Sequence, residues 1–232
     1  QQKCLGKMEE VSRSGRTVLV VSHNLETIEN LCASAIMLHK GTVEKYGDTK
    51  SIVDLYAKTS SNLTAVPLKD RTDRQGNGAM ILPEIEILDR AGNPQQLVVS
   101  GRETIFRLHY RGMSGRTFKR CTASVSVHAA QGTPYFLVAT DLSSKRQLDL
   151  SGEGYIDFVI PHMPLSAGTY HLAVFVDCNG EILDWVDHAA RMVVINGDFY
   201  ETGTGKVAPS GWEGVGVLVK HHWRLGSDSA LR

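Results

Sequence analysis

The clearest strand pattern in the chain is Tyr170-His-Leu-Ala-Val-Phe-Val-Asp177. Large apolar side chains occupy every second position from Tyr170 onward. The positions between them carry His171, Ala173, Phe175 and Asp177. Because successive side chains of a strand point to opposite faces, this period of two predicts a strand with one face in a core. The opposite face would present imidazole, aromatic and carboxylate groups together.

The same period recurs between residues 80 and 200, in the segments 84–87, 106–110, 123–128 and 156–160. Turn-forming sequences such as Ala91-Gly-Asn-Pro94 separate these segments. About seven or eight short strands predict a mainly β chain, folded as an antiparallel β-sandwich of immunoglobulin-like or jelly-roll type. The sequence Ser166-Ala-Gly-Thr-Tyr170 is typical of the tyrosine corner of such sandwiches, although Tyr170 fits an ordinary core position equally well.

Residues 1–58 follow a different, α/β pattern. The run Thr17-Val-Leu-Val-Val-Ser22 is apolar throughout, which is typical of a strand buried on both faces of a parallel sheet. A helix is expected over 25–32, a second apolar strand over 35–39 and, after a turn, a run over 42–46. A final helix begins at Asp48, a residue suited to the N-cap.

Residues 59–79 contain many charges and turn formers and few apolar residues. This composition predicts a solvated linker. We therefore expect a sandwich domain over residues 80–225 and a short tail over 226–232. The chain does not begin with Met, and we expect it to be part of a longer protein.

Composition excludes several classes of function. Lys plus Arg and Asp plus Glu cancel at 25 each, so the chain lacks the basic excess that nucleic-acid binding requires. Its nine histidines show no metal-ligand spacing, and no metal site is expected. The four cysteines lie far apart, which predicts reduced thiols in a cytosolic protein. They are Cys4, Cys32, Cys121 and Cys178.

His23 directly follows the run 17–22, at the edge where open α/β sheets hold ligands. This part of the chain resembles the C-terminal end of an ABC-transporter nucleotide-binding domain. The matching residues are 15–24, 25–32, 35–43, Gly47, Val53 and Tyr56. The resemblance implies that His23 is the switch histidine, which contacts the γ-phosphate of ATP and orients the attacking water in an intact subunit.

The sequence contains no GxxxxGK[ST] phosphate loop, and the family's signature loop and acidic Walker B strand are also missing. One histidine cannot form a site that needs a phosphate cradle and Mg²⁺. We therefore expect this chain to have no enzymatic activity and no cofactor of its own. By the resemblance, an intact subunit would be an ATPase that uses ATP and Mg²⁺.

An ABC ATPase end joined to a β-sandwich is similar to the ATP-binding subunits of polysaccharide ABC exporters, of the Wzt type that exports the O-antigen of lipopolysaccharide. The landmarks of the sandwich are 84–89, 101–110, 165–172, 184–185 and 214–223. The resemblance implies that the sandwich recognises the polysaccharide at its non-reducing end. It also implies a homodimer, a membrane-spanning partner subunit, and a cytoplasmic position at the inner membrane through the transporter.

Glycan recognition needs aromatic faces that stack on sugar rings and polar groups that bind hydroxyls. If the alternating apolar residues face a core, the opposite positions supply such groups. The predicted carbohydrate-binding residues are Arg107, His109, Ser126, His128, His171, Phe175 and Trp185. Two alternatives stay open: these are ordinary solvated residues on different sheets, and Trp185 is a core residue.

Two further points also stay open. The sandwich could instead be a protein-interaction or dimerisation module that docks on the transporter or on a glycan-modifying enzyme. The apolar run 214–223 follows a glycine-rich connection. This run could pair with its own sandwich or exchange with a second protomer, since identical strand edges pair equally well.

Overall fold

The structure is a computed structural model that describes residues 18–21, 28, 31–39, 41–53, 55–56, 66–130, 132–143, 148–203 and 216–221. Its first strands are β1 (Ser34–His39) and β2 (Thr42–Asp48). The sandwich begins with the 3₁₀ helix η1 (Leu68–Asp70) and the strands β3 (Met80–Leu88), β4 (Val98–Val99), β5 (Thr104–Gly112) and β6 (Thr117–Ala129). It continues with β7 (Pro134–Ala139), the helix α4 (Thr140–Ser143), β8 (Leu148–Ser151), β9 (Glu153–Ile160), β10 (Gly168–Cys178) and β11 (Glu181–Ile195).

The N-terminal segment contains the predicted strand pair. β1 and β2 form an antiparallel hairpin through the turn at Gly41. The helix expected at Asp48 is confirmed over residues 49–53 and 55–56. The Asp48 carboxylate accepts a hydrogen bond from the backbone N–H of Ser51 at 3.1 Å, which is the N-cap geometry.

The buried strand predicted over residues 17–22 is wrong for the residues that the structure describes. Residues 18–21 form no strand, and Leu19 and Val21 are 86% and 100% exposed. An all-apolar run becomes a buried strand only between neighbouring strands. None of the strands that the structure describes pairs with this run. His23 lies outside the described residues.

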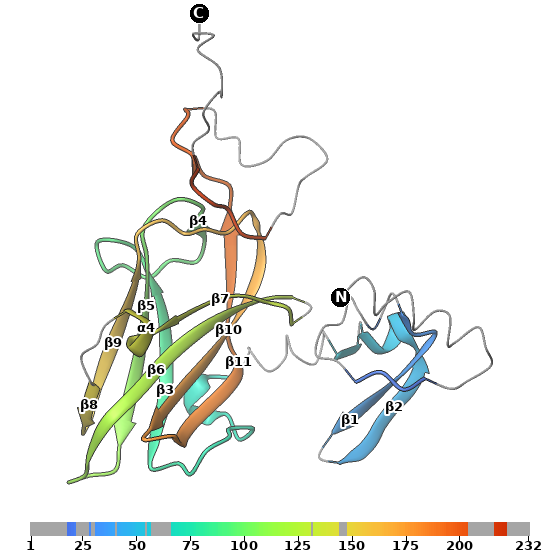
Figure 1. Cartoon of the computed structure of the whole chain (residues 1–232), viewed down its shortest axis with the longest axis horizontal. Coiled ribbons are helices and arrows are strands. Elements are labelled where there is room, and N and C mark those ends of the chain that lie inside the picture. The colour runs from blue at the N-terminus through green and yellow to red at the C-terminus, as the bar shows by residue number, and fades with distance from the viewer. Residues whose placement is uncertain are drawn as a thin grey trace, which may run out of the picture.

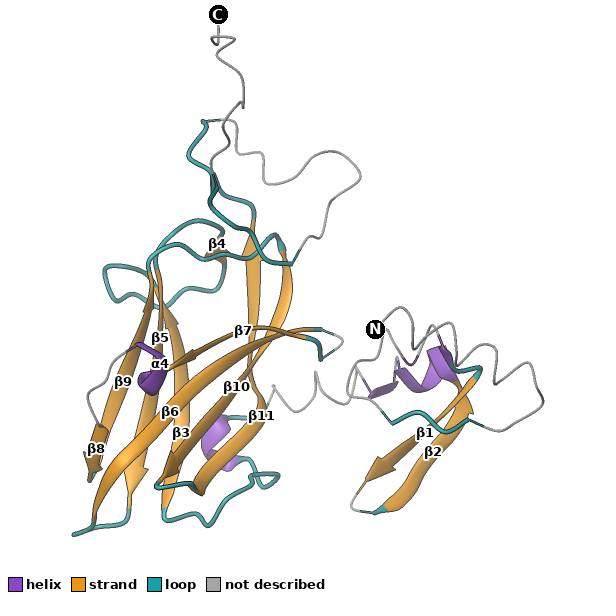
Figure 2. Ribbon diagram, viewed as in Figure 1, coloured by secondary structure: helices purple, strands orange, loops and turns teal. Residues whose placement is uncertain are grey.

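The predicted antiparallel sandwich is confirmed (Figures 1 and 2). One sheet has the order β4-β11-β10-β6-β7, with β8 also paired to β6. The other sheet has the order β3-β5-β9. The short β4 pairs with β11 in parallel, and the other pairs of the sandwich are antiparallel.

The core lies between the two sheets and contains the alternating residues expected from the sequence. The central residues are fully buried: Phe106, Leu108, Val125, Val127, Leu172 and Val174. Ile85 and Ile87 face the same side as their partners Leu108 and Phe106 but stay half-buried. The tyrosine corner is present, because the Tyr170 hydroxyl donates to the Ser166 carbonyl at 2.9 Å.

Most of residues 66–79 are exposed, as predicted for 59–79, but this segment is not a free linker because parts of it pack on the sandwich. Leu68 is 7% exposed and Arg71 5% exposed, and Gln75 exchanges two backbone hydrogen bonds with Trp185 of β11. The β11 partners of Arg71 and Gln75 lie more than 100 positions away, so no local pattern reveals these contacts. The domain boundaries themselves stay predictions.

Cys121 and Cys178 form a disulfide, so the prediction of reduced thiols is wrong for this pair. The two residues are 57 positions apart in sequence, but they lie directly opposite each other on β6 and β10. Strand register, which cysteine spacing does not reveal, brings the two sulfur atoms together. Cys32 is a free thiol, and Cys4 lies outside the described residues.

The described part of the C-terminal run folds back on its own sandwich. Val217 bridges to Leu165, and the N–H of Leu218 donates to the Pro164 carbonyl at 2.6 Å. Leu218 is only 3% exposed. Of the two arrangements left open by the sequence, this single chain adopts intramolecular pairing.

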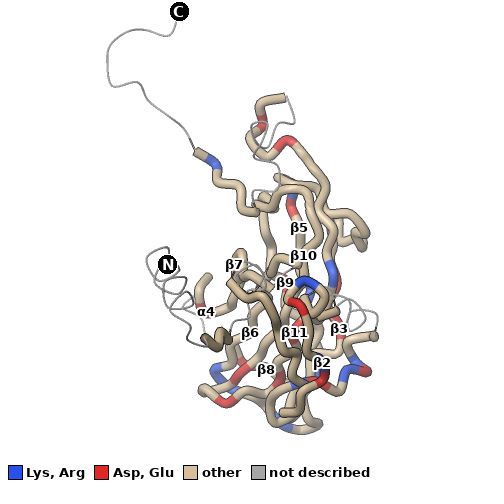
Figure 3. The backbone as a smooth tube through the Cα atoms, turned by 90° about the vertical axis from the view of Figure 1, so that its right-hand side faces the viewer, with Lys and Arg blue, Asp and Glu red and all other residues tan. Residues whose placement is uncertain are grey.

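Charged residues of both signs lie interspersed over the molecule (Figure 3). This arrangement agrees with the equal numbers of acidic and basic residues in the sequence. Within the described ranges, no helix has the length and hydropathy needed to cross a bilayer.

Candidate functional site

The outer face of the larger sheet brings together residues from its three central strands. We call this surface the histidine–aromatic face. It comprises Ser124, Ser126 and His128 of β6, His171, Ala173 and Phe175 of β10, and Trp185 and His188 of β11. The register places Phe175 between Ser124 and Trp185, and His171 beside His128. Directly paired residues share a face, so these side chains are neighbours.

Five of the predicted carbohydrate-binding residues lie on this face: Ser126, His128, His171, Phe175 and Trp185. Arg107 and His109 do not, so for these two residues the alternative of different sheets, which the sequence left open, applies. Both belong to β5, in the opposite sheet. Alternation shows which residues of a strand point outward, but it does not show which sheet the strand joins.

Arg107 and His109 are also engaged in cross-strand ion pairs. The Arg107 guanidinium binds both Asp157 oxygens at 2.8 Å and covers the Tyr155 ring at 4.2 Å. The Nε2 atom of His109 lies 2.7 Å from a Glu86 carboxylate oxygen. These pairs stabilise the register of the smaller sheet and engage Nε and Nη2 of Arg107 and Nε2 of His109.

Phe175 and Trp185 form the aromatic part of the face. Their ring centroids are 6.4 Å apart and the ring planes meet at 76°, an edge-to-face arrangement. Both side chains are half-buried, so Trp185 is not the fully buried core residue that the sequence also allowed. A partly exposed aromatic pair offers an apolar platform to a ligand.

His171 and His188 form the second part of the face. Their ring centroids are 4.9 Å apart, and His171 is only 5% exposed. Burial, reinforced by His188, Arg191 and His128, lowers the pKa of His171 to about 4. Burial also lowers the pKa of His188, against the opposing effect of Asp187. Both imidazoles are therefore neutral near pH 7.

Hydrogen bonds fix the tautomer of His128. Its Nδ1 atom lies 3.3 Å from the Gly132 carbonyl, and its Nε2 atom lies 2.8 Å from the Ser126 hydroxyl. A carbonyl oxygen only accepts, so we assign the proton to Nδ1. In this tautomer Nε2 accepts from the Ser126 hydroxyl.

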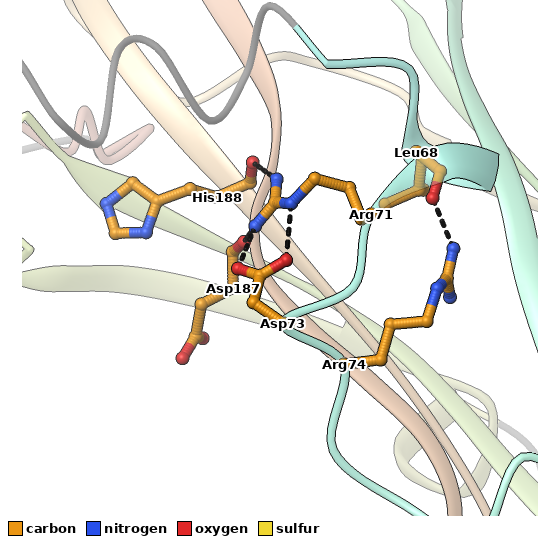
Figure 4. A network of polar contacts seen from close by, with 6 residues as sticks. All are labelled: Leu68, Arg71, Asp73, Arg74, Asp187 and His188. Atoms are coloured by element: carbon orange, nitrogen blue, oxygen red, sulfur yellow. Dashed lines mark hydrogen bonds and ion pairs between the residues drawn. The ribbon is translucent and has the colours of Figure 1, made fainter. Parts of the chain in front are cut away.

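Sequence reasoning missed the contacts between Arg71 and the backbone of β11, which support this face (Figure 4). The two terminal nitrogens of Arg71 each donate at 2.9 Å, to the carbonyls of Asp187 and His188. The Asp73 carboxylate accepts from Nε and Nη2 of Arg71, both at 2.6 Å. Hydrogen bonds from this guanidinium lower the pKa of Asp73. Arg71 and Asp73 belong to the segment that the sequence assigned to the linker.

The residues of the face are buried or half-buried, and none of them is fully exposed. Hollows of about 600 and 300 Å³ lie elsewhere, one beside Asp89 and His162 and one beside Lys119 and Cys178, and neither is lined by a residue of the face. Among the described residues, no group of three His, Cys, Asp or Glu side chains is arranged to hold a metal ion. The side chains of the face include aromatic rings and hydrogen-bonding groups.

Comparison with known families is decisive for the sandwich. A family model described as the Wzt C-terminal domain matches residues 71–207, which is more than half of the chain. The chain belongs to the Wzt C-terminal domain family. The predicted resemblance to Wzt-type subunits is thereby confirmed. The whole histidine–aromatic face, Arg71 and Asp73 lie within the region matched by the Wzt C-terminal domain model.

The fold agrees with this family. A crystal structure of the C-terminal domain of Wzt matches with a TM-score of 0.54 and 14% identity. The alignment covers 70% of this chain and 94% of that domain. At this level of identity the match shows a shared fold.

Two curated proteins match a smaller part of this Wzt-family chain. The teichoic acids export ATP-binding protein TagH of Bacillus anthracis is 38% identical over 72 residues, which is 31% of this chain and 13% of that protein. The ABC transporter protein AbcA of Aeromonas salmonicida is 34% identical over 58 residues, which is 25% of this chain and 19% of that protein. The matched regions span less than a fifth of either relative.

Proposed function

We propose that the histidine–aromatic face binds a polysaccharide and selects it for export by an ABC transporter. The observation that carries this proposal is the presence of a half-buried aromatic pair and a histidine pair on one sheet face of a Wzt C-terminal domain. The name of the TagH relative, a teichoic acids export ATP-binding protein, supports a role in glycan export.

The chemistry of the face fits a sugar. Phe175 and Trp185 would stack on the apolar C–H faces of a pyranose ring. A neutral imidazole offers one donor and one acceptor, so His188 can bind sugar hydroxyls in either direction. His171 lies beneath His188 and is too buried for direct contact, so its role would be to support the ring above it.

The remaining functional expectations belong to the same proposal. The face would recognise the non-reducing end of a chain such as an O-antigen, and the chain would act as a homodimer with a membrane-spanning partner subunit. The intact subunit would use ATP and Mg²⁺ at the inner membrane, with His23 as its switch histidine. This chain alone would have no catalytic activity. A shallow face binds weakly, and a dimer would raise the avidity.

A titration of the full chain with surface polysaccharide from its own organism tests the proposal, with Trp fluorescence or NMR as the readout. A second sample has its non-reducing terminus trimmed. Phe175→Ala should weaken saturable binding about ten-fold or more. Tyr155→Ala is the matched control, because Tyr155 is an aromatic residue that is 55% exposed on the opposite sheet.

The outcomes separate the possible functions. Binding that is lost on trimming would support recognition of the chain end. Binding that survives trimming would support glycan binding by the face and reject recognition of the non-reducing end. Absence of binding to either sample by a folded chain would reject glycan recognition and favour the protein-interaction module.

A further inference from the structure

We infer that Arg71 is a positioning residue for the histidine–aromatic face, because it holds the backbone of β11 at the point where Trp185 and His188 are presented. The inference rests on the proposed function only in naming a polysaccharide as the ligand. The arrangement itself is a property of the free protein.

The first observation is an irregularity in β11. Leu172 pairs with Ala190 and Val174 with Val186, so residues 187–189 stand against the single residue Ala173. Such a bulge disrupts the ladder and changes the direction of the side chains it carries. The carbonyls of Asp187 and His188 lie in this bulge, and Arg71 donates to both.

The second observation is the conformation of His188. Its φ angle is +50°, in the left-handed region that a residue with a Cβ adopts at a cost. Surrounding contacts must therefore maintain this conformation. The carbonyl of His188 is held by Arg71 at 2.9 Å, and its ring lies against His171. Loss of the first contact would release the strained residue and move its ring.

The third observation is that the same segment also fixes Trp185. Gln75, four residues after Arg71, donates to the Trp185 carbonyl at 2.9 Å and accepts from its N–H at 2.8 Å. The chain that leads into the sandwich thus contacts the backbone of both an aromatic and an imidazole residue of the face. Loss of the Arg71 or Gln75 contacts would therefore reach the face directly.

A guanidinium is required for this role. Arg71 is 5% exposed and makes at least four hydrogen bonds, two to Asp73 and one to each carbonyl. Lysine carries a single ammonium on a flexible stem and cannot reproduce this planar pattern. Asp73 orients the guanidinium through a bidentate pair, which is among the stronger geometries for hydrogen bonds.

The test compares Arg71→Lys and Asp73→Asn with Arg74→Lys in the full chain. Arg74 is a matched control: it lies in the same segment and binds Asp184 and the carbonyls of Leu68 and Leu82, but not the bulge. The ligand-free readout is NMR of the His188 ring C–H and Trp185 indole N–H signals. The second readout is titration with the polysaccharide of the parent organism.

We expect Arg71→Lys to shift the His188 and Trp185 signals and to weaken polysaccharide binding about ten-fold, with a smaller effect for Asp73→Asn. Arg74→Lys should lower the melting temperature and leave both signals and the affinity near wild type. If Arg71→Lys does not fold, the Asp73→Asn variant tests the inference instead. This change replaces one carboxylate oxygen with an amide nitrogen and disturbs the packing little.

Two results would overturn the inference. One is unchanged His188 and Trp185 signals in a folded Arg71→Lys or Asp73→Asn chain, and the other is equal shifts in Arg74→Lys. If the wild-type chain binds no polysaccharide, the proposed function fails, but the ligand-free signals still decide the role of Arg71.

Discussion

His188 lies against His171, with ring centroids 4.9 Å apart and planes tilted by 54°. The contact joins β11 to β10 at a position where the ladder between them is interrupted. His171 is buried, and its Nδ1 atom has no hydrogen-bond partner among the residues that the structure describes. A proton on either ring would place a charge in this packed contact, which makes the pair sensitive to pH.

Acidification should destabilise the fold through His171. Its pKa falls from the ordinary 6.5 to about 4 in the folded chain, mainly through burial. The unfolded chain therefore binds more protons than the folded chain between these values. The stabilisation is complete above about pH 6.5 and is lost as the pH falls toward 4, by up to about 3 kcal/mol. Urea unfolding at about pH 7.5 and about pH 5 measures this loss.

His171→Leu provides the control for this pH dependence, because it removes the titrating group and keeps an apolar side chain at a buried position. The difference in unfolding free energy between the two pH values should shrink markedly in this variant. The pH dependence of the unfolding free energy that remains would come from His188, whose pKa is also lowered by burial. An equal slope in the variant and the wild type would show that His171 does not carry the effect.

Reduction of the Cys121–Cys178 disulfide should lower the free energy of unfolding by about 2–4 kcal/mol, because the bond closes a long loop in the unfolded chain. Urea unfolding with and without a thiol reductant measures the difference. Cys32→Ser should change neither curve, since Cys32 is a free thiol. A thiol assay on the denatured, unreduced chain that finds all four cysteines free would contradict the bond.

Asp184→Ala should be among the most destabilising single changes, at about 3–5 kcal/mol. Asp184 is 1% exposed, pairs with Arg74 and accepts from the N–H of Leu82 at 2.7 Å. Truncation would leave the half-buried Arg74 guanidinium without its counter-charge. Asp187→Ala is the control, because the Asp187 side chain is exposed and only its backbone carbonyl is held. Similar denaturant midpoints for the two variants would argue against this account.

Alternation along single strands was sufficient to predict the sandwich and the inward residues of β5, β6, β9 and β10. Side-chain direction depends only on parity within a strand, which the sequence displays directly. Sheet membership depends on pairing between distant strands, and no local pattern contains it. For this reason the sequence left open whether His128, Phe175 and Arg107 share a face; the first two do, and Arg107 lies on the other sheet.

The support of the face could not be predicted for a related reason. A run such as Lys69-Asp-Arg-Thr-Asp-Arg74 has the composition of a solvated linker, and two of its arginines make their contacts with β11. In a sequence, a charged residue that becomes buried looks the same as one that stays exposed. Only its partner in the folded chain distinguishes the two. The Cys121–Cys178 disulfide was not predicted for the same reason, because the register between β6 and β10 brings the two residues together.

Gly216→Ala should detach the C-terminal run from the sandwich. A Cβ atom at this position would lie 2.3 Å from the Tyr135 ring, which is too close for any side chain. Because Tyr135 itself packs edge-on against Tyr170 at 5.6 Å, it has little freedom to withdraw. The hydrogen bonds from the N–H groups of Ser166 and Leu218 would be lost, and the buried Leu218 would become exposed.

Limited proteolysis of the folded chain measures this release as faster cleavage near residue 218. The change from Gly216 to Ala in a Tyr135→Ala background should have a smaller effect, because the obstructing ring is gone. Gly180→Ala is a control for the general cost of replacing a glycine, since nothing lies within 4 Å of its added Cβ. Its φ of +81° makes the change strained in the β10–β11 turn, so it should lower stability without exposing the C-terminal run. Equal cleavage rates near residue 218 in Gly216→Ala and the wild type would show that contact with Tyr135 does not hold the run in place.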